Sequence, residues 1–187
     1  MTPQHGGLAP SAWVRRWSAL VPAGARVLDV ACGSGRHVRW FAARGAHVTA
    51  LDRDADALAP LRALPGAAVE VIVADIENGP WPLAGRRFDA VVVTNYLWRA
   101  LLPTLVASLD DSGVLIYETF ARGNETVGKP SNPDFLLQPG ELLGAVRGLR
   151  VIAFEDGFIA EAEPRFVQRV AAVRERPPPS GPTRYPL

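Results

Sequence analysis

Residues 26–37 read RVLDVACGSGRH, and this stretch decides the fold that we expect for the chain. An apolar, β-branched run ends at two glycines that are one residue apart, and a helical pattern follows. Gly33 and Gly35 have no Cβ atom, so they adopt positive φ easily and let a ligand approach the backbone. We therefore expect a buried strand, a tight turn and the start of a helix, with a ligand beside the turn.

Similar apolar runs recur along the chain and alternate with helical patterns, which is typical of βαβ units that build a parallel sheet. Strands are expected at 26–32, 47–52, 69–75, 88–95, 113–120, 149–155 and 166–174. Helices are expected at 12–20 (within an N-terminal segment 8–20), 34–44, 54–64, 97–109 and 141–146. The prediction is an α/β fold with a doubly wound, seven-stranded sheet, in a single domain over 1–187 with its core at 26–174.

Two segments interrupt this alternation. Residues 122–139, RGNETVGKPSNPDFLLQP, are rich in Gly, Pro and Asn, and a loop of this length is usually functional or disordered. We expect it to lie on the substrate side of the site. Residues 177–187, PPPSGPTRYPL, are too rich in proline to pack, so we expect a frayed, flexible C-terminal tail.

The composition limits the possible partners and location. Among 187 residues, 20 basic and 19 acidic side chains give a net charge of +1, and no long basic run indicates a nucleic-acid partner. Cys32 is the single cysteine, which excludes an internal disulfide and a multi-cysteine metal site, and no metal is expected. The sequence has neither an apolar span of about 18 residues nor a signal-peptide pattern, so we expect a cytoplasmic protein without a membrane partner. The oligomeric state is left open.

Acidic residues follow the ends of three successive expected strands. Asp29 lies near the end of the first, Asp52 ends the second and Asp75 ends the third. About one βα unit separates each from the next, as a doubly wound sheet requires. Because parallel strands end at the same edge, these carboxylates are expected around one crevice, with Asp52 accepting hydrogen bonds from ribose hydroxyls. The alternative for Asp52 and Asp75 is a helix N-cap after a strand.

The glycine turn distinguishes between two kinds of nucleotide cofactor. A dinucleotide-binding fingerprint needs a third glycine at position 38, where the chain has Val38. VLDVACGSGR instead resembles the first motif of the class I S-adenosylmethionine (SAM)-dependent methyltransferases, apart from Ala31, where that family more often has glycine. The resemblance covers residues 26–174 and implies a Rossmann-like methyltransferase fold whose last strand is antiparallel. It also implies SAM as the cofactor and S-adenosylhomocysteine as the product.

The resemblance further implies which residues hold the cofactor. Asp75 would accept a hydrogen bond from the adenine amino group, and Ile76 would pack against the ring. Arg36 and His37 would contact the cofactor carboxylate; the alternatives are that Arg36 is solvated and that His37 orients the loop. The expected cofactor-binding residues are Asp29, Ala31, Gly33, Gly35, Arg36, His37, Asp52, Arg53, Asp75, Ile76 and Asn95.

Methyl transfer needs a nucleophile aligned with a methyl group that a sulfonium already activates, so a general base is optional. Glu118, at the end of the fifth expected strand, is the first candidate for such a base, and His37 is the second. Tyr96 and Trp98 are candidates for aromatic contact with the sulfonium, although Trp98 also suits a core position. Cys32 is expected to pack as a small apolar residue. The expected catalytic residues are Glu118 and Tyr96.

The methyl acceptor is the open part of the prediction. The run NYLWRALLP resembles small bacterial methyltransferases related to the tellurite and thiopurine methyltransferase group, and one domain favours a small-molecule acceptor. Tentative substrate residues are Trp98, Arg99 and Arg122, and Lys129 would also select an anion unless it is merely solvated. The alternatives are an RNA or protein methyltransferase, or a SAM-binding regulatory protein that has lost catalysis. A nicotinamide oxidoreductase is disfavoured by Val38.

Overall fold

The computed structural model describes residues 9–160, 163–176 and 183–187, and the structural statements below concern these residues. The strands are β1 (Arg26–Val30), β2 (His47–Asp52), β3 (Val69–Val73), β4 (Phe88–Thr94), β5 (Leu109–Phe120), β6 (Arg150–Ile159) and β7 (Arg165–Val173). The α-helices are α1 (Ala12–Trp17), α2 (Arg36–Ala42), α3 (Ala55–Leu58), α4 (Leu102–Ala107) and α5 (Glu141–Ala145). Short 3-10 helices occupy Ser18–Leu20, Ala59–Ala63, Arg99–Leu101, Asn124–Thr126 and Pro133–Phe135. Within the described ranges, none of the helices is long and apolar enough to cross a membrane.

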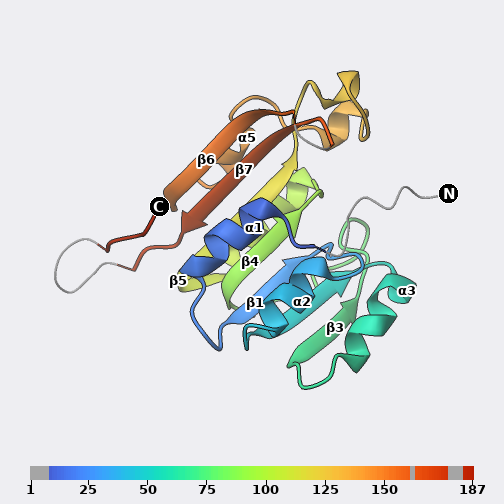
Figure 1. The fold of residues 1–187 in the computed structure, drawn as a ribbon, viewed down its shortest axis with the longest axis vertical. Coiled ribbons are helices and arrows are strands. Elements are labelled where there is room, and N and C mark those ends of the chain that lie inside the picture. Colours follow the sequence, from blue (N-terminus) through green and yellow to red (C-terminus); the bar gives the residue numbers. More distant parts are fainter. Residues whose placement is uncertain (1–8, 161–162, 177–182) are drawn as a thin grey trace.

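The strands form one seven-stranded sheet with the order β3-β2-β1-β4-β5-β7-β6 (Figure 1). The first five strands are parallel to their neighbours in this group, whereas β7 is antiparallel to both β5 and β6. The expected doubly wound, mostly parallel sheet with an antiparallel last strand is confirmed. The strand order reverses between β1 and β4, and ligands of such sheets bind in the crevice at that point, outside the carboxyl ends of the strands.

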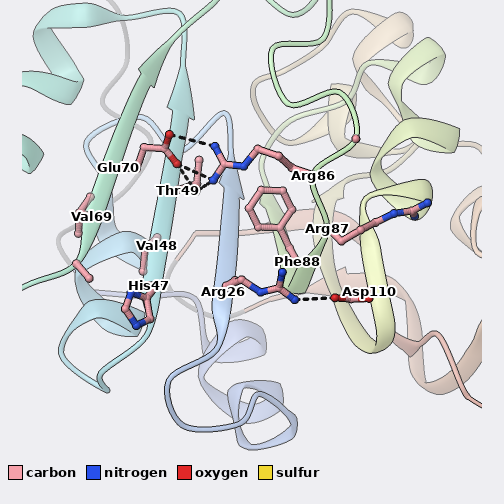
Figure 2. A pocket seen from close by; sticks show the side chains of 12 residues that line it. Arg26, His47, Val48, Thr49, Val69, Glu70, Arg86, Arg87, Phe88 and Asp110 are labelled. Carbon is pink, nitrogen blue, oxygen red and sulfur yellow. Dashed lines mark hydrogen bonds and ion pairs between the residues drawn. The ribbon is translucent and has the colours of Figure 1, made fainter.

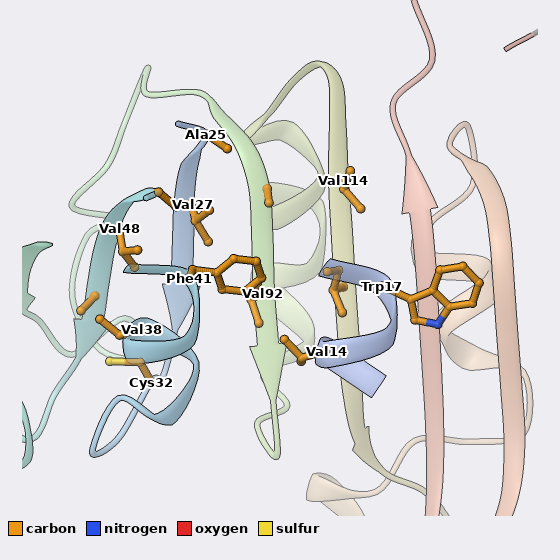
Figure 3. Close-up of a cluster of buried hydrophobic side chains, with 14 of the residues drawn as sticks. Val14, Trp17, Ala25, Val27, Cys32, Val38, Phe41, Val48, Val92 and Val114 are labelled. Carbon is orange, nitrogen blue, oxygen red and sulfur yellow. The ribbon is translucent and has the colours of Figure 1, made fainter. Parts of the chain in front are cut away.

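Helices cover both faces of the sheet. The face under α1, α2 and α3 carries one buried cluster, which includes Phe41 (Figure 3). The opposite face carries a second cluster with Leu105 of α4 and Leu142 of α5. Side chains alternate between the faces along a strand, so in β5 Ile116 belongs to the first cluster and Tyr117 to the second. The same alternation decides which face each polar residue of the site occupies.

The N-terminal helix is shorter than expected. α1 ends at Trp17 and a 3-10 turn completes the predicted span to Leu20. Ser11 is its N-cap, because the Ser11 hydroxyl accepts hydrogen bonds from the N–H groups of Trp13 and Val14. Residue 8 of the predicted N-terminal segment lies outside the described residues.

Several predicted boundaries need correction. The helix expected over 97–109 is a 3-10 turn followed by α4 alone, because β5 already begins at Leu109 and not at residue 113. The helix expected over 54–64 divides into α3 and a 3-10 segment that contains Pro60, which has no N–H to donate. β6 continues to Ile159 because it pairs with β7 as far as that residue.

The C-terminal end is also corrected in part. Tyr185 packs against the first buried cluster, and the guanidinium carbon of Arg150 lies 5.9 Å from its ring centroid. The expectation that the tail does not pack is therefore wrong at Tyr185. Residues 177–182 lie outside the described residues.

Candidate functional site

The turn after β1 has an unusual backbone. Ala31, Gly33 and Gly35 have φ values of 52°, 54° and 76°, so three of its residues are left-handed. A Cβ atom on Gly35 would lie 2.6 Å from both terminal carbons of Leu61, so glycine is required there for space as well as for φ. Gly35 is the N-cap of α2, so the predicted strand, turn and helix are present.

Asp52, the last residue of β2, holds this turn. Its Oδ2 accepts a hydrogen bond from the Gly33 N–H at 2.7 Å, and its Oδ1 accepts one from the Asp54 N–H at 2.9 Å. Asp54 is the N-cap of α3, which argues against the N-cap alternative for Asp52. A carboxylate has about four lone-pair directions, so both oxygens of Asp52 keep acceptor capacity for ligand hydroxyls.

Asp75 lies two residues beyond the end of β3 and caps the turn that follows. Its carboxylate accepts hydrogen bonds from the Glu77 N–H at 3.0 Å, the Asn78 N–H at 3.2 Å and the Asn78 Nδ2 at 2.9 Å. The bond from the Asn78 side chain is the main reason why the pKa of Asp75 is lowered, and the charge of Arg53 adds to the effect. The N-cap alternative named a helix, whereas Asp75 caps a turn that no helix follows. Ile76, the next residue, packs against the second buried cluster.

Asp29 is a buried acid in β1, with 1% of its surface exposed. Burial raises its pKa to about 8, which the positive charge of Arg36 partly opposes. Within the part of the chain that the structure describes, its Oδ2 has no hydrogen-bond partner. A buried carboxylate oxygen without a partner is costly, so this position favours a cationic or hydrogen-donating group of a ligand. Burial also lowers the pKa of Arg36, while the charges of Glu118 and Asp29 raise it.

His37, in the first turn of α2, is a buried neutral histidine. Its Nε2 accepts a hydrogen bond from the Ser11 N–H at 3.1 Å, and its Nδ1 lies 3.5 Å from the Thr94 hydroxyl oxygen. An accepting Nε2 places the proton on Nδ1. Burial, together with the charge of Arg36, lowers the pKa of His37 to about 3. These contacts support the loop-orienting alternative, since His37 joins the glycine turn to the segment before α1.

Glu118 is buried and has partners at both oxygens. Its Oε1 accepts a hydrogen bond from the Ser11 hydroxyl at 2.8 Å, and its Oε2 lies 3.1 Å from Nη1 of Arg169 in β7. Both oxygens of the carboxylate are thus engaged by groups of the protein itself. The contacts of Glu118 therefore favour an anchoring role over the general-base role that the sequence suggested.

A cavity of about 400 Å³ opens at the carboxyl ends of β4 and β5, next to the point where the strand order reverses. Its lining includes Thr119. Side chains alternate along a strand, so Thr119 points to the opposite face of β5 from its neighbour Glu118. Among the described residues, the lining consists of Glu77, Asn95, Tyr96, Leu97, Thr119, Phe120, Lys129, Pro130 and Phe135. Glu77, Thr119 and Phe135 were not predicted, because only the folded chain brings these separate loops together.

Two expected site residues lie in this cavity. Asn95 follows β4 with a φ of 55°, a left-handed conformation that asparagine tolerates better than most residues. The Tyr96 hydroxyl is buried and has no hydrogen-bond partner among the described residues. Burial and, second, the negative charge of Glu77 raise the pKa of Tyr96, so its hydroxyl stays protonated and can donate. Cys32 is also buried, and its burial raises the thiol pKa, as suits a packing role.

The tentative substrate residues are placed differently from the expectation. Arg99 forms an ion pair with Glu141 at 2.7 Å and donates to the carbonyl oxygens of Asp134 at 2.6 Å and Leu136 at 2.8 Å. Its guanidinium is therefore committed to holding the 122–139 segment and does not face the cavity as a free cation. Trp98 is 37% exposed, which contradicts a core position, and does not belong to the cavity lining.

Arg122 donates to Oε1 of Gln138 at 3.3 Å and likewise lies outside the cavity lining. Among the residues that the structure describes, the cation that lines the cavity is Lys129.

A larger hollow of about 710 Å³ lies at the opposite, amino-terminal edge of the sheet (Figure 2). The connection from β3 to β4, residues 74–87, contains turns and no helix. Arg86 of this connection forms an ion pair with Glu70, with Nη2 2.7 Å from Oε2. Arg26 is paired with Asp110 at 2.6 Å on the other side of the hollow. Two of its three arginines are thus paired with carboxylates. The hollow lies away from the carboxyl ends where ligands of such sheets bind, so we place the functional site in the crevice.

The glycine turn after β1, the acid that closes β2 and the cavity beyond β4 and β5 define a nucleotide-cofactor-binding α/β protein of the Rossmann-like kind. Comparison with known proteins narrows this class. A family described as "Methyltransferase domain" matches residues 27–112. This match extends over less than half of the chain, and it agrees with the resemblance of the glycine turn to the class I SAM-dependent methyltransferases.

Solved structures share the fold. TehB from Haemophilus influenzae is 16% identical with a TM-score of 0.73, and the match covers 92% of this chain and 65% of that one. An S-adenosylmethionine dependent methyltransferase from Mesorhizobium loti is 21% identical with a TM-score of 0.69, and the match covers 90% of this chain and 100% of that one.

Curated relatives match in sequence over part of their length. A malonyl-[acyl-carrier protein] O-methyltransferase of Pectobacterium atrosepticum is 37% identical over an alignment of 117 residues, and the match covers 58% of this chain and 45% of the relative. The chain thus spans less than half the length of that relative.

Proposed function

We propose that this chain transfers a methyl group from SAM to a small-molecule acceptor. One observation carries the proposal, which is the position of two features at neighbouring strand ends. The glycine turn, whose Gly33 N–H donates to Asp52, follows β1, and the cavity that Tyr96 lines follows the adjacent strand β4. A cofactor on the turn and an acceptor in the cavity would therefore lie side by side in the crevice between these strands.

The residues present fit the cofactor. Gly33 and Gly35 leave the backbone of the turn open, and Asp52 has spare acceptor capacity for the two ribose hydroxyls. The unpartnered oxygen of Asp29 suits the amino group of the methionyl part, and Arg36 suits its carboxylate. By resemblance to the family, we also assign Ala31, Arg53, Asp75, Ile76 and Asn95 to the cofactor side, with His37 orienting the turn that holds the cofactor.

SAM supplies a methyl group that is already activated by a sulfonium, so the residues of the chain mainly have to align the acceptor. Alignment of reacting groups alone contributes roughly 7 to 11 kcal/mol toward lowering a barrier. Tyr96 lines the cavity, so we assign its aromatic ring to contact with the activated methyl group and the acceptor. Where the acceptor must lose a proton, Glu77 lines the cavity and is better placed to take it than Glu118, which is paired with Arg169.

The proposal is tested by incubating the protein with SAM labelled in the methyl group and with fractionated cell extract. Label in a small-molecule fraction supports the proposal. Label in RNA or protein would identify a macromolecular acceptor instead, and binding of SAM without any transfer would identify a regulatory SAM-binding protein. Calorimetric titration with SAM should show that Asp52→Ala weakens binding by about 1 to 3 kcal/mol through lost ribose hydrogen bonds. The matched variant Asp54→Ala removes the cap of α3 and should leave the affinity nearly unchanged.

A further inference from the structure

The cavity beyond β4 and β5 has mostly apolar walls. Tyr96, Leu97, Phe120, Pro130 and Phe135 supply aromatic and aliphatic surface on several sides. Phe135 is 47% exposed although it lines the cavity, so part of a large aromatic ring is left in contact with solvent. Covering such apolar surface removes it from water and is favourable. An apolar, flat occupant would gain this free energy.

The walls of the cavity are held in place before any ligand binds. Asn124 is buried, its Nδ2 donates to the Pro130 carbonyl oxygen at 3.0 Å, and its Oδ1 accepts from the Phe166 N–H at 3.2 Å. Arg99 holds the carbonyl oxygens on either side of Phe135. A preformed cavity of about 400 Å³ falls in the range of small-molecule sites, which are mostly apolar with a few placed polar groups.

Two opposite charges border these walls. Glu77 comes from the connection after β3 and lines the cavity together with Tyr96, so it borders the cavity from the side of β3, β2 and β1 in the strand order. Lys129 comes from the segment after β5, and its Nζ donates to the Ser131 hydroxyl at 3.3 Å. No ion pair joins Lys129 to a carboxylate in the part of the chain that is described, so its charge is available to a ligand.

We propose that the acceptor is a small aromatic molecule with an anionic group, which binds with its ring between Phe135 and Phe120 and its anion at Lys129. This inference deepens the proposed function and rests on it. The anion fixes one end of the molecule. The other end then lies at Tyr96 and Glu77, where the atom to be methylated meets the methyl donor.

The test uses three probes with the same ring and different charge: naphthoate, naphthol and naphthylmethylamine. Each is titrated at neutral pH into the full chain saturated with S-adenosylhomocysteine. Naphthoate should bind about 10-fold more tightly than naphthol, as expected for a charge-assisted hydrogen bond, and naphthylmethylamine should bind most weakly. Lys129→Ala should abolish the preference for naphthoate, and Lys129→Arg should retain it. Phe135→Ala should weaken the binding of all three probes.

Arg147→Ala is the matched control, since Arg147 is an exposed cation outside the cavity lining. Four outcomes would each overturn the inference: equal affinity for the three probes, preference for the amine, no probe binding at all, or a preference for naphthoate that survives Lys129→Ala. Binding of SAM is measured on the same samples. Failure of SAM binding would count against the proposed function, whereas failure of probe binding with SAM binding intact counts against the acceptor class alone.

Discussion

The hydroxyl of Ser11 donates a hydrogen bond to the carboxylate of Glu118 at 2.8 Å, although 107 residues separate them in the sequence. The same carboxylate is paired with Arg169 in β7, and the Ser11 N–H donates to His37 in α2. The start of α1 is thereby tied to β5, β7 and the helix that follows the glycine turn. We conclude that this buried polar group fixes the segment before α1 at the edge of the site.

Glu118→Gln should lower the free energy of unfolding by about 1 to 3 kcal/mol, because the buried ion pair with Arg169 is replaced by a neutral contact. Urea unfolding followed by tryptophan fluorescence measures the effect, since Trp13 and Trp17 lie in the adjoining cluster. Glu155→Gln is the control: Glu155 also pairs with Arg169 but is 45% exposed, so its loss should cost less than about 1 kcal/mol. Equal stability of the Glu118 variant and the natural chain would contradict the anchoring role.

Ala31→Gly should stabilise the fold by about 1 kcal/mol, because Ala31 has a φ of 52° and glycine removes the steric cost of its Cβ there. Gly35→Ala should have the opposite effect, since a Cβ would meet Leu61 at 2.6 Å in addition to the positive φ. Thermal unfolding of the two variants measures both signs. A lower melting temperature for Ala31→Gly would show that the left-handed backbone at Ala31 is not strained.

The stability of the fold should depend on pH through His37. Its pKa is lowered to about 3 by burial, below the value of about 6.5 in an unfolded chain, so between these values the unfolded state binds more protons. The contribution of neutral His37 is therefore fully present above pH 6.5 and is lost as the pH falls toward 3. Relative to His37→Gln, the natural chain should lose roughly 2 kcal/mol between pH 6.5 and pH 4.5.

Urea midpoints of both proteins at the two pH values give this difference, and groups common to both cancel. Asp29 acts in the opposite direction, because a carboxyl pKa raised to about 8 makes the folded state lose stability as the pH rises. A stability difference between the two proteins that does not change with pH would refute the assignment of His37 as a buried neutral base.

Arg99→Ala should loosen the 122–139 segment, because its guanidinium binds Glu141 and two carbonyl oxygens of that segment. Limited chymotrypsin digestion should then cut after Phe135, which is 47% exposed, roughly 10-fold faster, as expected when charge-assisted hydrogen bonds are lost. Mass spectrometry of the fragments measures the rate. Arg122→Ala removes one exposed contact at 3.3 Å and should leave the rate almost unchanged. Equal rates for the two variants would exclude Arg99 as the residue that holds the segment.

Much of the fold could be read from local patterns. The RVLDVACGSGRH stretch predicted a strand, a glycine turn and a helix correctly, because backbone preferences and apolar periodicity act between near neighbours. Each of the seven strands was predicted from the sequence. Because the expected strands alternate with helices along the chain, a doubly wound sheet could be predicted as well. The boundaries of the helices were less well predicted, since their ends depend on packing and on strand pairing, as the early start of β5 at Leu109 illustrates.

The sequence alone determined the class of fold, the glycine turn and the position of Asp52 beside it. Only the tertiary structure decided what Glu118, Arg99 and Lys129 do, because each role depends on partners or cavity walls that are distant in the sequence. A charged residue at a strand end or on a loop looks the same in sequence whether it is paired, buried or free. Its chemistry is set by the charges and the solvent around it, and these exist only once the chain has folded.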